Sequence, residues 1–294
     1  MKPIRSFLYA PGNRERIMAK APEAGADAVM FDLADSVPVA EKDTARRMVA
    51  DALTALAGKN LFVKLNDADS GYIEDDLDAV ARAGLSGVLL PEVDKPETVI
   101  AVDRLLSRHE AERGLKTGAI EMILLLETAS AIIRAYELAT ASPRVVSLCC
   151  GTAEGGDLIR SLGCAWSLTG PERTCLRGRV LLAARAARLP WPIDGVYANL
   201  GDPEGLEVEA RLARRAGLRG KLAIHPKQIE GIHRVFAPTK AEIDWSRRVL
   251  EAREEALSRG TSAVLVDGIL VSAAAAERAR DLIAEVSAFS HEGA

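Results

Sequence analysis

The chain has 294 residues, of which 48% are hydrophobic, and a formal net charge of −4. This length and apolar content allow one large buried core, so the chain is globular and fits either one α/β barrel or two smaller domains. The slightly acidic balance argues against nucleic acid as a partner, and no apolar run approaches the roughly 20 residues needed to cross a bilayer.

The N-terminal residues 1–5 lead directly into a short apolar run and lack the apolar core of a signal peptide. The four cysteines show no metal-ligand spacing, which fits a reducing compartment. We therefore expect a cytoplasmic protein without membrane partners.

Short apolar runs of strand length alternate along the chain with stretches rich in Ala, Leu, Glu and Arg at helical spacing. Strands are expected over residues 6–10, 28–33, 61–65, 87–90, 121–126, 145–150, 194–198 and 221–224. Helices are expected over residues 41–56, 73–83, 97–113, 129–139, 172–188 and 205–216. The strands are mostly too apolar to have one wet face, which is typical of parallel strands covered by helices. Eight βα units predict a TIM barrel over residues 1–236.

An open, doubly wound α/β sheet is the alternative fold. Its first turn would carry a GxGxxG fingerprint, whereas this chain has Pro11, Gly12 and Asn13 there.

Beyond the eighth strand, residues 237–294 are expected to form a C-terminal extension with a helix over 242–259, a hairpin-like segment over 262–272 and a helix over 273–288. The Ala-rich start of the last helix suits burial against another surface, so we expect this lid-like extension to pack on a neighbouring subunit.

In a barrel, catalytic residues gather at the carboxyl ends of the strands. These ends carry Pro11-Gly12-Asn13, Asp32, Lys64 with Asn66, Pro91-Glu92, Glu127, Gly151 leading to Asp157, Asn199 and His225. Glu127 and Asp157 follow neighbouring strands, and two such carboxylates can hold one hard divalent cation. Either acid alone would more often cap a helix, so it is their convergence with a lysine that favours a metal-assisted enzyme.

Several motifs form a specific pattern when they are taken together. They are Leu8-Tyr9-Ala10-Pro11-Gly12-Asn13, Phe31-Asp32-Leu33-Ala34-Asp35-Ser36-Val37, Lys42 with Ala45-Arg46, Leu126-Glu127-Thr128, Gly220-Lys221 through Ala223-Ile224-His225-Pro226-Lys227-Gln228, and Val266-Asp267-Gly268. In these motifs, and nearly end to end, the chain resembles the citrate lyase β-subunit-like branch of the HpcH/HpaI aldolase family. The resemblance implies a TIM-barrel, Mg-dependent lyase that cleaves or forms a carbon–carbon bond in citryl, malyl or citramalyl thioesters.

The resemblance also implies roles for individual residues. Glu127 and Asp157 would ligate Mg²⁺ or Mn²⁺, whose other positions take water and the oxygens of a 2-oxo acid. Asp267 would reach the barrel mouth of a neighbouring subunit in a homo-oligomer, a trimer or hexamer, and act there as an acid or base. From the residues alone, Asp267 followed by Gly268 is equally a hairpin turn.

The acyl-CoA substrate requires phosphate contacts, and the resemblance assigns them to Arg16 and Lys20. Their spacing of four places both on one helix face, which is otherwise simply a solvated charged face. Lys64 would be the cation that contacts the substrate, and Asn66 would lie beside it.

Asp32, Asp35 and His225 are expected to support the residues that contact metal and substrate. They follow the second and eighth expected strands. A lone histidine is otherwise more often a hydrogen-bonded core residue than a catalyst.

The chain departs from the family pattern at several of these positions. Lys64 stands where the family usually has an arginine that grips a carboxylate with two prongs, Ala34 replaces a glutamate, and Glu92 replaces a lysine. The loop after the sixth expected strand is longer by about two residues, so the ligand could be Glu154; the distance to Gly163 favours Asp157.

Three functions remain open at this point. The first, which the metal acids and basic residues favour, is a free-standing acyl-CoA lyase that yields an acyl-CoA and a 2-oxo acid. The second is an aldolase that acts on free hydroxy acids without CoA. The third is a weakly catalytic, citrate-lyase-like subunit of a larger assembly, for which Lys64 and Ala34 are the argument.

Overall fold

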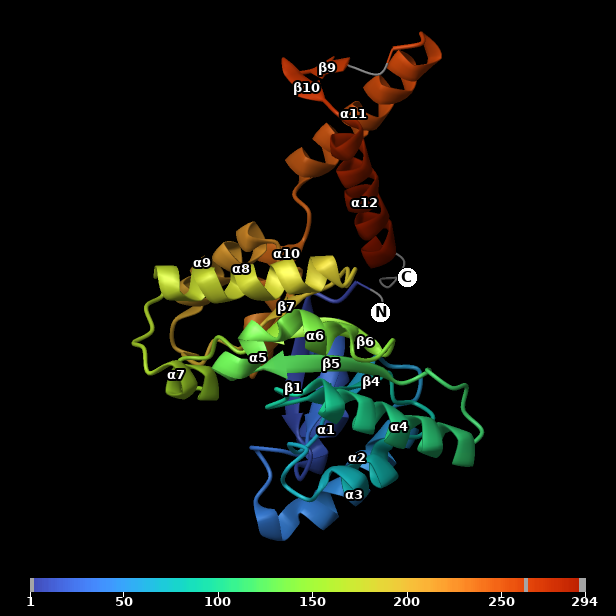
Figure 1. The fold of residues 1–294 in the computed structure, drawn as a ribbon, viewed down its shortest axis with the longest axis vertical. Coiled ribbons are helices and arrows are strands. Elements are labelled where there is room, and N and C mark those ends of the chain that lie inside the picture. Colours follow the sequence, from blue (N-terminus) through green and yellow to red (C-terminus); the bar gives the residue numbers. More distant parts are fainter. Residues whose placement is uncertain (1–2, 262–263, 291–294) are drawn as a thin grey trace. The chain divides into compact units, whose positions relative to one another are not determined.

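The computed structural model describes residues 3–261 and 264–290. The chain divides into two compact units, one formed by Pro3–Phe236 and the other beginning at Ala237 (Figure 1). Each unit has its own hydrophobic core.

The first unit is a closed barrel of eight parallel strands in sequence order, in which β8 pairs back onto β1. The strands are β1 Ser6–Pro11, β2 Ala28–Asp32, β3 Leu61–Lys64, β4 Gly87–Leu90, β5 Glu121–Leu126, β6 Val145–Cys150, β7 Ile193–Asp194 and β8 Gly220–Ala223. Every residue of β2, β3 and β4 is buried. The prediction of a TIM barrel is confirmed.

Helices surround the strands of the barrel (Figure 1). They are α1 Glu15–Lys20, η1 Ala21–Ala24, η2 Val39–Glu41, α2 Lys42–Ala55, α3 Ile73–Val80, α4 Pro96–Glu112, α5 Ala129–Ile133, α6 Ala135–Thr140, α7 Asp157–Leu162, α8 Pro171–Ala186, α9 Pro203–Ala216, η3 Pro226–Gln228 and α10 Ile229–Phe236. The helix expected over residues 129–139 is two helices, because Arg134 has φ −91° and ψ 11°, outside the helical region.

The seventh strand lies earlier than expected and is shorter. Strand β7 ends at Asp194, and the chain then leaves the ladder. A Cβ on Gly195 would lie 2.7 Å from the carbonyl oxygen of Cys150, so the backbone packs closely there. The carbonyl of Tyr197 accepts a hydrogen bond from Nε2 of Gln228 at 2.8 Å, and not from a neighbouring strand. Residues 195–198 of the expected strand are therefore a loop, which packs closely at Gly195.

The second unit contains α11 Lys240–Ser258, a two-stranded antiparallel hairpin of β9 Val264–Val266 and β10 Ile269–Val271, and α12 Ala273–Ser290. Thr239 and Glu242 form a capping box at the start of α11. The hairpin was expected to begin at residue 262, but residues 262 and 263 lie outside the described part.

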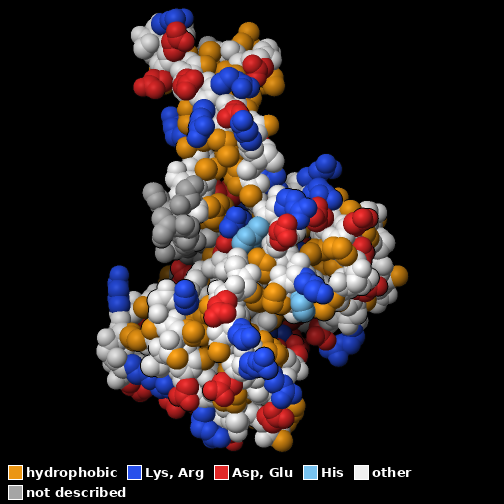
Figure 2. All heavy atoms as spheres, turned by 180° about the vertical axis from the view of Figure 1, so that it is seen from behind, with side chains coloured by type: hydrophobic (Ala, Val, Ile, Leu, Met, Phe, Trp, Pro, Cys, Tyr) orange, Lys and Arg blue, Asp and Glu red, His pale blue; other side chains and the backbone are white. Residues whose placement is uncertain are grey.

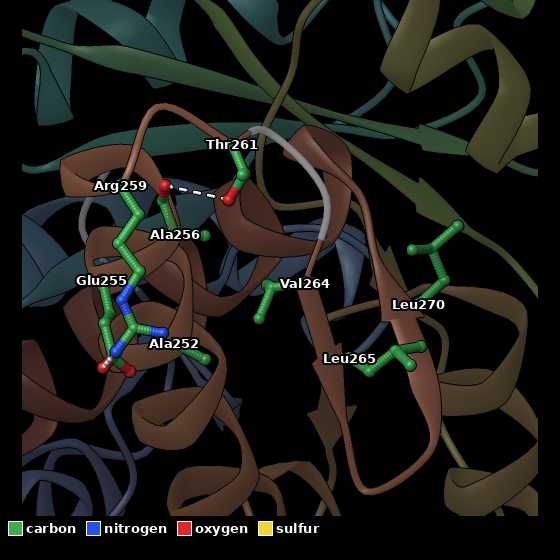
Figure 3. A pocket seen from close by; sticks show the side chains of 8 residues that line it. All are labelled: Ala252, Glu255, Ala256, Arg259, Thr261, Val264, Leu265 and Leu270. Carbon is green, nitrogen blue, oxygen red and sulfur yellow. Dashed lines mark hydrogen bonds and ion pairs between the residues drawn. The ribbon is translucent and has the colours of Figure 1, made fainter.

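A cavity of about 390 Å³ lies between the end of α11 and the hairpin (Figure 3). Its charged lining residues, Glu255 and Arg259, pair with each other.

Basic and acidic side chains are interspersed over the face of the molecule shown in Figure 2. Among the described residues, no helix combines the length and the apolar character that a membrane span requires.

Five charged side chains from strands β7 and β8 and helices α8 and α9 form a cluster that is almost fully buried. Asp194 accepts hydrogen bonds from Arg177 at 2.8 and 2.9 Å and from Lys221 at 2.7 Å. Glu209 accepts from Lys221 at 2.5 Å and also pairs with Arg173. Burial alone would raise the pKa of Asp194, but Arg177 and Lys221 hold it well below its usual range. The carboxylate therefore stays ionised, and each buried charge has a counter-charge.

This cluster reaches the loop that follows β6. The hydroxyl of Thr152 donates to Oδ1 of Asp194 at 3.0 Å, and the carbonyl of Thr152 accepts from Nε1 of Trp166 at 2.8 Å. The loop that leads to Asp157 is thus fixed at its base.

We expect Asp194→Asn to lower the free energy of unfolding by about 3–5 kcal/mol, because Arg177 and Lys221 would lose a buried counter-charge. Urea unfolding measures the change. The matched control is Glu230→Gln, which breaks an exposed pair with Arg234 and should cost no more than about 0.5 kcal/mol. Equal effects of the two substitutions would contradict the structural role of the cluster.

Candidate active site

A cavity of about 360 Å³ opens at the carboxyl ends of the barrel strands. Its charged lining residues are Asp32, Asp35, Lys64, Glu127 and Asp157. The structure therefore brings together both predicted metal ligands, the predicted cation and two of the predicted supporting acids. The cavity in the second unit contains no comparable group of acids.

Glu127 directly follows β5 and lies half-buried in the cavity wall. Burial raises the pKa of this carboxyl to about 7, helped by the negative charges of Asp157 and Asp35 and opposed by Lys64. Gly151 makes room for it, since a Cβ there would lie 2.6 Å from Cγ of Glu127. A carboxyl with such a raised pKa is one that a bound cation would stabilise in its ionised form.

Asp157 is the first residue of α7 and lines the same cavity. One of its oxygens pairs with Arg160 at 2.8 Å, on the exposed side of the helix. Glu154, the alternative ligand, is exposed on the preceding loop and is not part of the cavity wall. The geometry therefore favours Asp157 over Glu154.

The carboxylates of the cavity wall are a possible donor set for a metal ion. Within the described residues, no three His, Cys, Asp or Glu side chains gather closely enough to form a complete metal site. Two carboxylates that share a cavity fit a hard divalent cation, such as Mg²⁺, which commonly keeps several water or substrate oxygens as ligands.

Lys64 is the last residue of β3, and its ammonium group lies in the cavity wall. Its Nζ lies 2.5 Å from Oδ2 of Asp35 and 6.0 Å from the centre of the Tyr9 ring. Burial lowers the pKa of Lys64, but Asp32, Asp35 and Glu127 outweigh this effect and raise the pKa above its ordinary value. Lys64 is therefore a fixed positive charge at neutral pH.

Asp32, the last residue of β2, and Asp35, in the loop that follows, have different roles. Asp32 is buried, and its oxygens accept hydrogen bonds from the backbone N–H groups of Ala34 at 2.8 Å and Ser36 at 3.2 Å. Asp35 is exposed and pairs with Lys64. Asp32 thus shapes the turn that presents Asp35 to Lys64.

Asn66 does not reach the cavity. It is buried, its Oδ1 accepts from Nζ of Lys42 at 2.5 Å, and its Nδ2 donates to Asp76 at 2.7 Å. Lys42 also donates to the carbonyls of Leu33 at 2.8 Å and Ala34 at 3.1 Å. Asn66 therefore belongs to a hydrogen-bond network that connects the loops after β2 and β3. The motif that contains Lys42 was the only sequence signal for this network.

The remaining predicted residues lie outside the cavity wall. Arg16 and Lys20 are exposed on α1, and His225 precedes η3, where its Nδ1 accepts from the backbone N–H of Lys227 at 3.1 Å. Asp267 lies in the turn between β9 and β10 with φ 51° and pairs with Arg248 at 2.6 Å. The role of Asp267 at a neighbouring subunit stays a prediction.

Tyr9, on β1, is a lining residue that the sequence did not single out for a role. Burial, together with nearby Asp32, Cys149 and Glu127, raises the pKa of its phenol well above the ordinary value. The hydroxyl therefore keeps its proton and can donate a hydrogen bond. The sequence signal for it was weak, because alternation within a strand does not say which face lines a cavity.

The chain is similar to several known proteins. The model of the HpcH/HpaI aldolase/citrate lyase family matches residues 5–226. The citrate lyase subunit beta of Escherichia coli K12 is 36% identical over 292 residues, which cover 98% of this chain and 95% of that protein. A (3S)-malyl-CoA thioesterase of Cereibacter sphaeroides is also 36% identical, over 98% of this chain and 96% of that protein.

Among solved structures, CitE from Mycobacterium tuberculosis in complex with magnesium, acetoacetate and coenzyme A is similar with a TM-score of 0.75. The two chains are 28% identical, and the match covers 97% of this chain and 98% of that one. The chain therefore belongs to the HpcH/HpaI aldolase/citrate lyase family and is an enzyme of the lyase class.

Proposed function

We propose that the protein is a Mg²⁺-dependent carbon–carbon lyase that acts on a hydroxyacyl-CoA thioester and releases an acyl-CoA and a 2-oxo acid, or runs the reverse reaction. The observation that carries the proposal is one cavity lined by Glu127, Asp157 and the charged Lys64. The similar CitE structure, in complex with magnesium, acetoacetate and coenzyme A, supports the same ligand classes here.

Glu127 and Asp157 would hold the cation through their carboxylate oxygens. When bound, the cation would stabilise the negative charge on the substrate's hydroxyl oxygen as that hydroxyl loses its proton. The last residue of β1, Pro11, lines the cavity, and Arg16 and Lys20 lie on the helix that follows this strand. These two side chains would contact the CoA phosphates.

The cleavage itself is a retro-aldol step. The substrate hydroxyl loses its proton to solvent as its carbon becomes a carbonyl, and the adjacent carbon–carbon bond breaks. The electron pair of that bond passes to the carbon beside the thioester, which then takes up a proton from solvent, so the step involves no net change in protons. Lys64 would stabilise the carboxylate next to the new carbonyl, and the Tyr9 hydroxyl would donate a hydrogen bond within the cavity.

The proposed activity is tested with citramalyl-, malyl- and citryl-CoA beside the corresponding free hydroxy acids. We expect cleavage of at least one thioester and not of the free acids, with activity lost on chelation and reduced by about a thousandfold in Glu127→Ala. Equal cleavage of the free acids would indicate an aldolase that does not need CoA. Failure to cleave any of these compounds with Mg²⁺ present would contradict the proposal.

The raised pKa of Glu127 predicts a pH dependence for metal binding. Below pH 7 the carboxyl is largely protonated, so protons compete with the cation; the affinity for Mn²⁺ should rise with pH and level off above about 7. Glu92→Gln removes a negative neighbour and should move this midpoint to lower pH, whereas Lys64→Gln removes a positive one and should move it higher. Mn²⁺ titrations followed by electron paramagnetic resonance measure both. Identical midpoints in all three proteins would contradict the assignment of Glu127.

Lys64 is predicted to bind the substrate carboxylate. Lys64→Gln should lower kcat/KM by about 10²–10³-fold, because a charge near the reacting carbons is lost, and Lys64→Arg should restore part of it. Steady-state kinetics on the best thioester test this, with Lys59→Gln, on the loop before β3, as the control. Unchanged kinetics in Lys64→Gln would leave Lys64 with only a structural role beside Asp35.

A further inference from the structure

Negatively charged side chains outnumber positively charged ones in the cavity wall. Of the described residues that line it, four are carboxylates, Asp32, Asp35, Glu127 and Asp157, and one is a cation, Lys64. The nearby Arg160 is already paired with Asp157, lies outside the lining and has a side chain that is 78% exposed. The cavity therefore offers very little positive charge to an anionic substrate.

A bound divalent cation would balance Glu127 and Asp157. Lys64 balances one further charge and is already engaged with Asp35 through one of its three N–H groups. The two remaining N–H groups can hold one substrate carboxylate. A second substrate carboxylate would then face the remaining negative charge in the cavity with only the hydroxyls of Tyr9 and Ser36, and no second cation, among the lining side chains.

The rest of the wall suits an uncharged group. Leu125, Val196 and Leu222 contribute aliphatic side chains, and Ile224 lies at the end of β8 with 39% of its surface exposed. An unpaired carboxylate placed against such a surface loses hydration without gaining a hydrogen bond, which is costly. A methyl group or a hydrogen there loses nothing.

Building on the proposed function, we propose that the site accepts a 2-oxo acid with a single carboxylate and discriminates against dicarboxylates. In thioester terms it would prefer citramalyl-CoA, which has a methyl group, over citryl-CoA, which has a carboxymethyl group at the same carbon. The specificity would thus differ from that suggested by the name of the similar citrate lyase subunit.

The matched pair citramalyl-CoA and citryl-CoA tests this preference. Acetyl-CoA release is measured with Mg²⁺ by chromatography on the full-length protein. We expect kcat/KM for citramalyl-CoA to exceed that for citryl-CoA by about a hundredfold or more, the penalty of one unpaired carboxylate. Equal values, or a preference for citryl-CoA, would overturn the inference and leave the proposed function standing. Failure to cleave either compound would overturn the inference, and the proposed function would then stand only if malyl-CoA is cleaved.

A substitution that supplies the missing charge tests the cause of the preference. Ile224→Arg should narrow the ratio of the two kcat/KM values by about tenfold or more, because it offers the second carboxylate a partner. The matched control is Ile100→Arg on α4, where the isoleucine is 37% exposed and lies outside the cavity wall; it should leave the ratio unchanged. An unchanged ratio in Ile224→Arg would overturn the explanation by charge.

Discussion

The pairing of β8 with β1, which closes the barrel, is the constraint on which the rest of the structure depends. Closure brings the backbones so close that a Cβ on Gly220 would lie 2.5 Å from the carbonyl oxygen of Ile4. The same carbonyl accepts a hydrogen bond from Nε1 of Trp191 at 2.6 Å. Once the ladder closes, all eight carboxyl ends meet at one mouth, so Tyr9 and Leu222, from opposite ends of the barrel sequence, line one cavity.

Two carboxyl groups of this barrel have pKa values that are shifted in opposite directions. Asp194 is surrounded by Arg177 and Lys221, and its pKa is depressed because the fold itself supplies the counter-charges. Glu127 is half-buried, and its burial together with its negative neighbours raises its pKa to about 7. The first arrangement stabilises the fold, whereas the second leaves a group whose compensation must come from a ligand.

The fold by itself does not select a substrate. Relatives named as a citrate lyase subunit and as a malyl-CoA thioesterase are equally similar to this chain over nearly its whole length. One departure from the family pattern lies in the cavity wall, where Lys64 stands in place of the expected arginine. A lysine binds a carboxylate as a single point charge and not through a two-pronged fork. Repulsion from the surrounding carboxylates therefore has a larger effect on which substrates can bind.

The sequence by itself determined the barrel and the acids at its mouth, because apolar runs and strand ends are local patterns that the closed ladder turns into one site. It did not determine where β7 ends, since that depends on close packing at Gly195. It predicted Asn66 at the substrate, whereas Asn66 is held by Lys42 and Asp76 and does not line the cavity. The position of Asn66 depends on contacts between distant segments, and only the tertiary structure decided it.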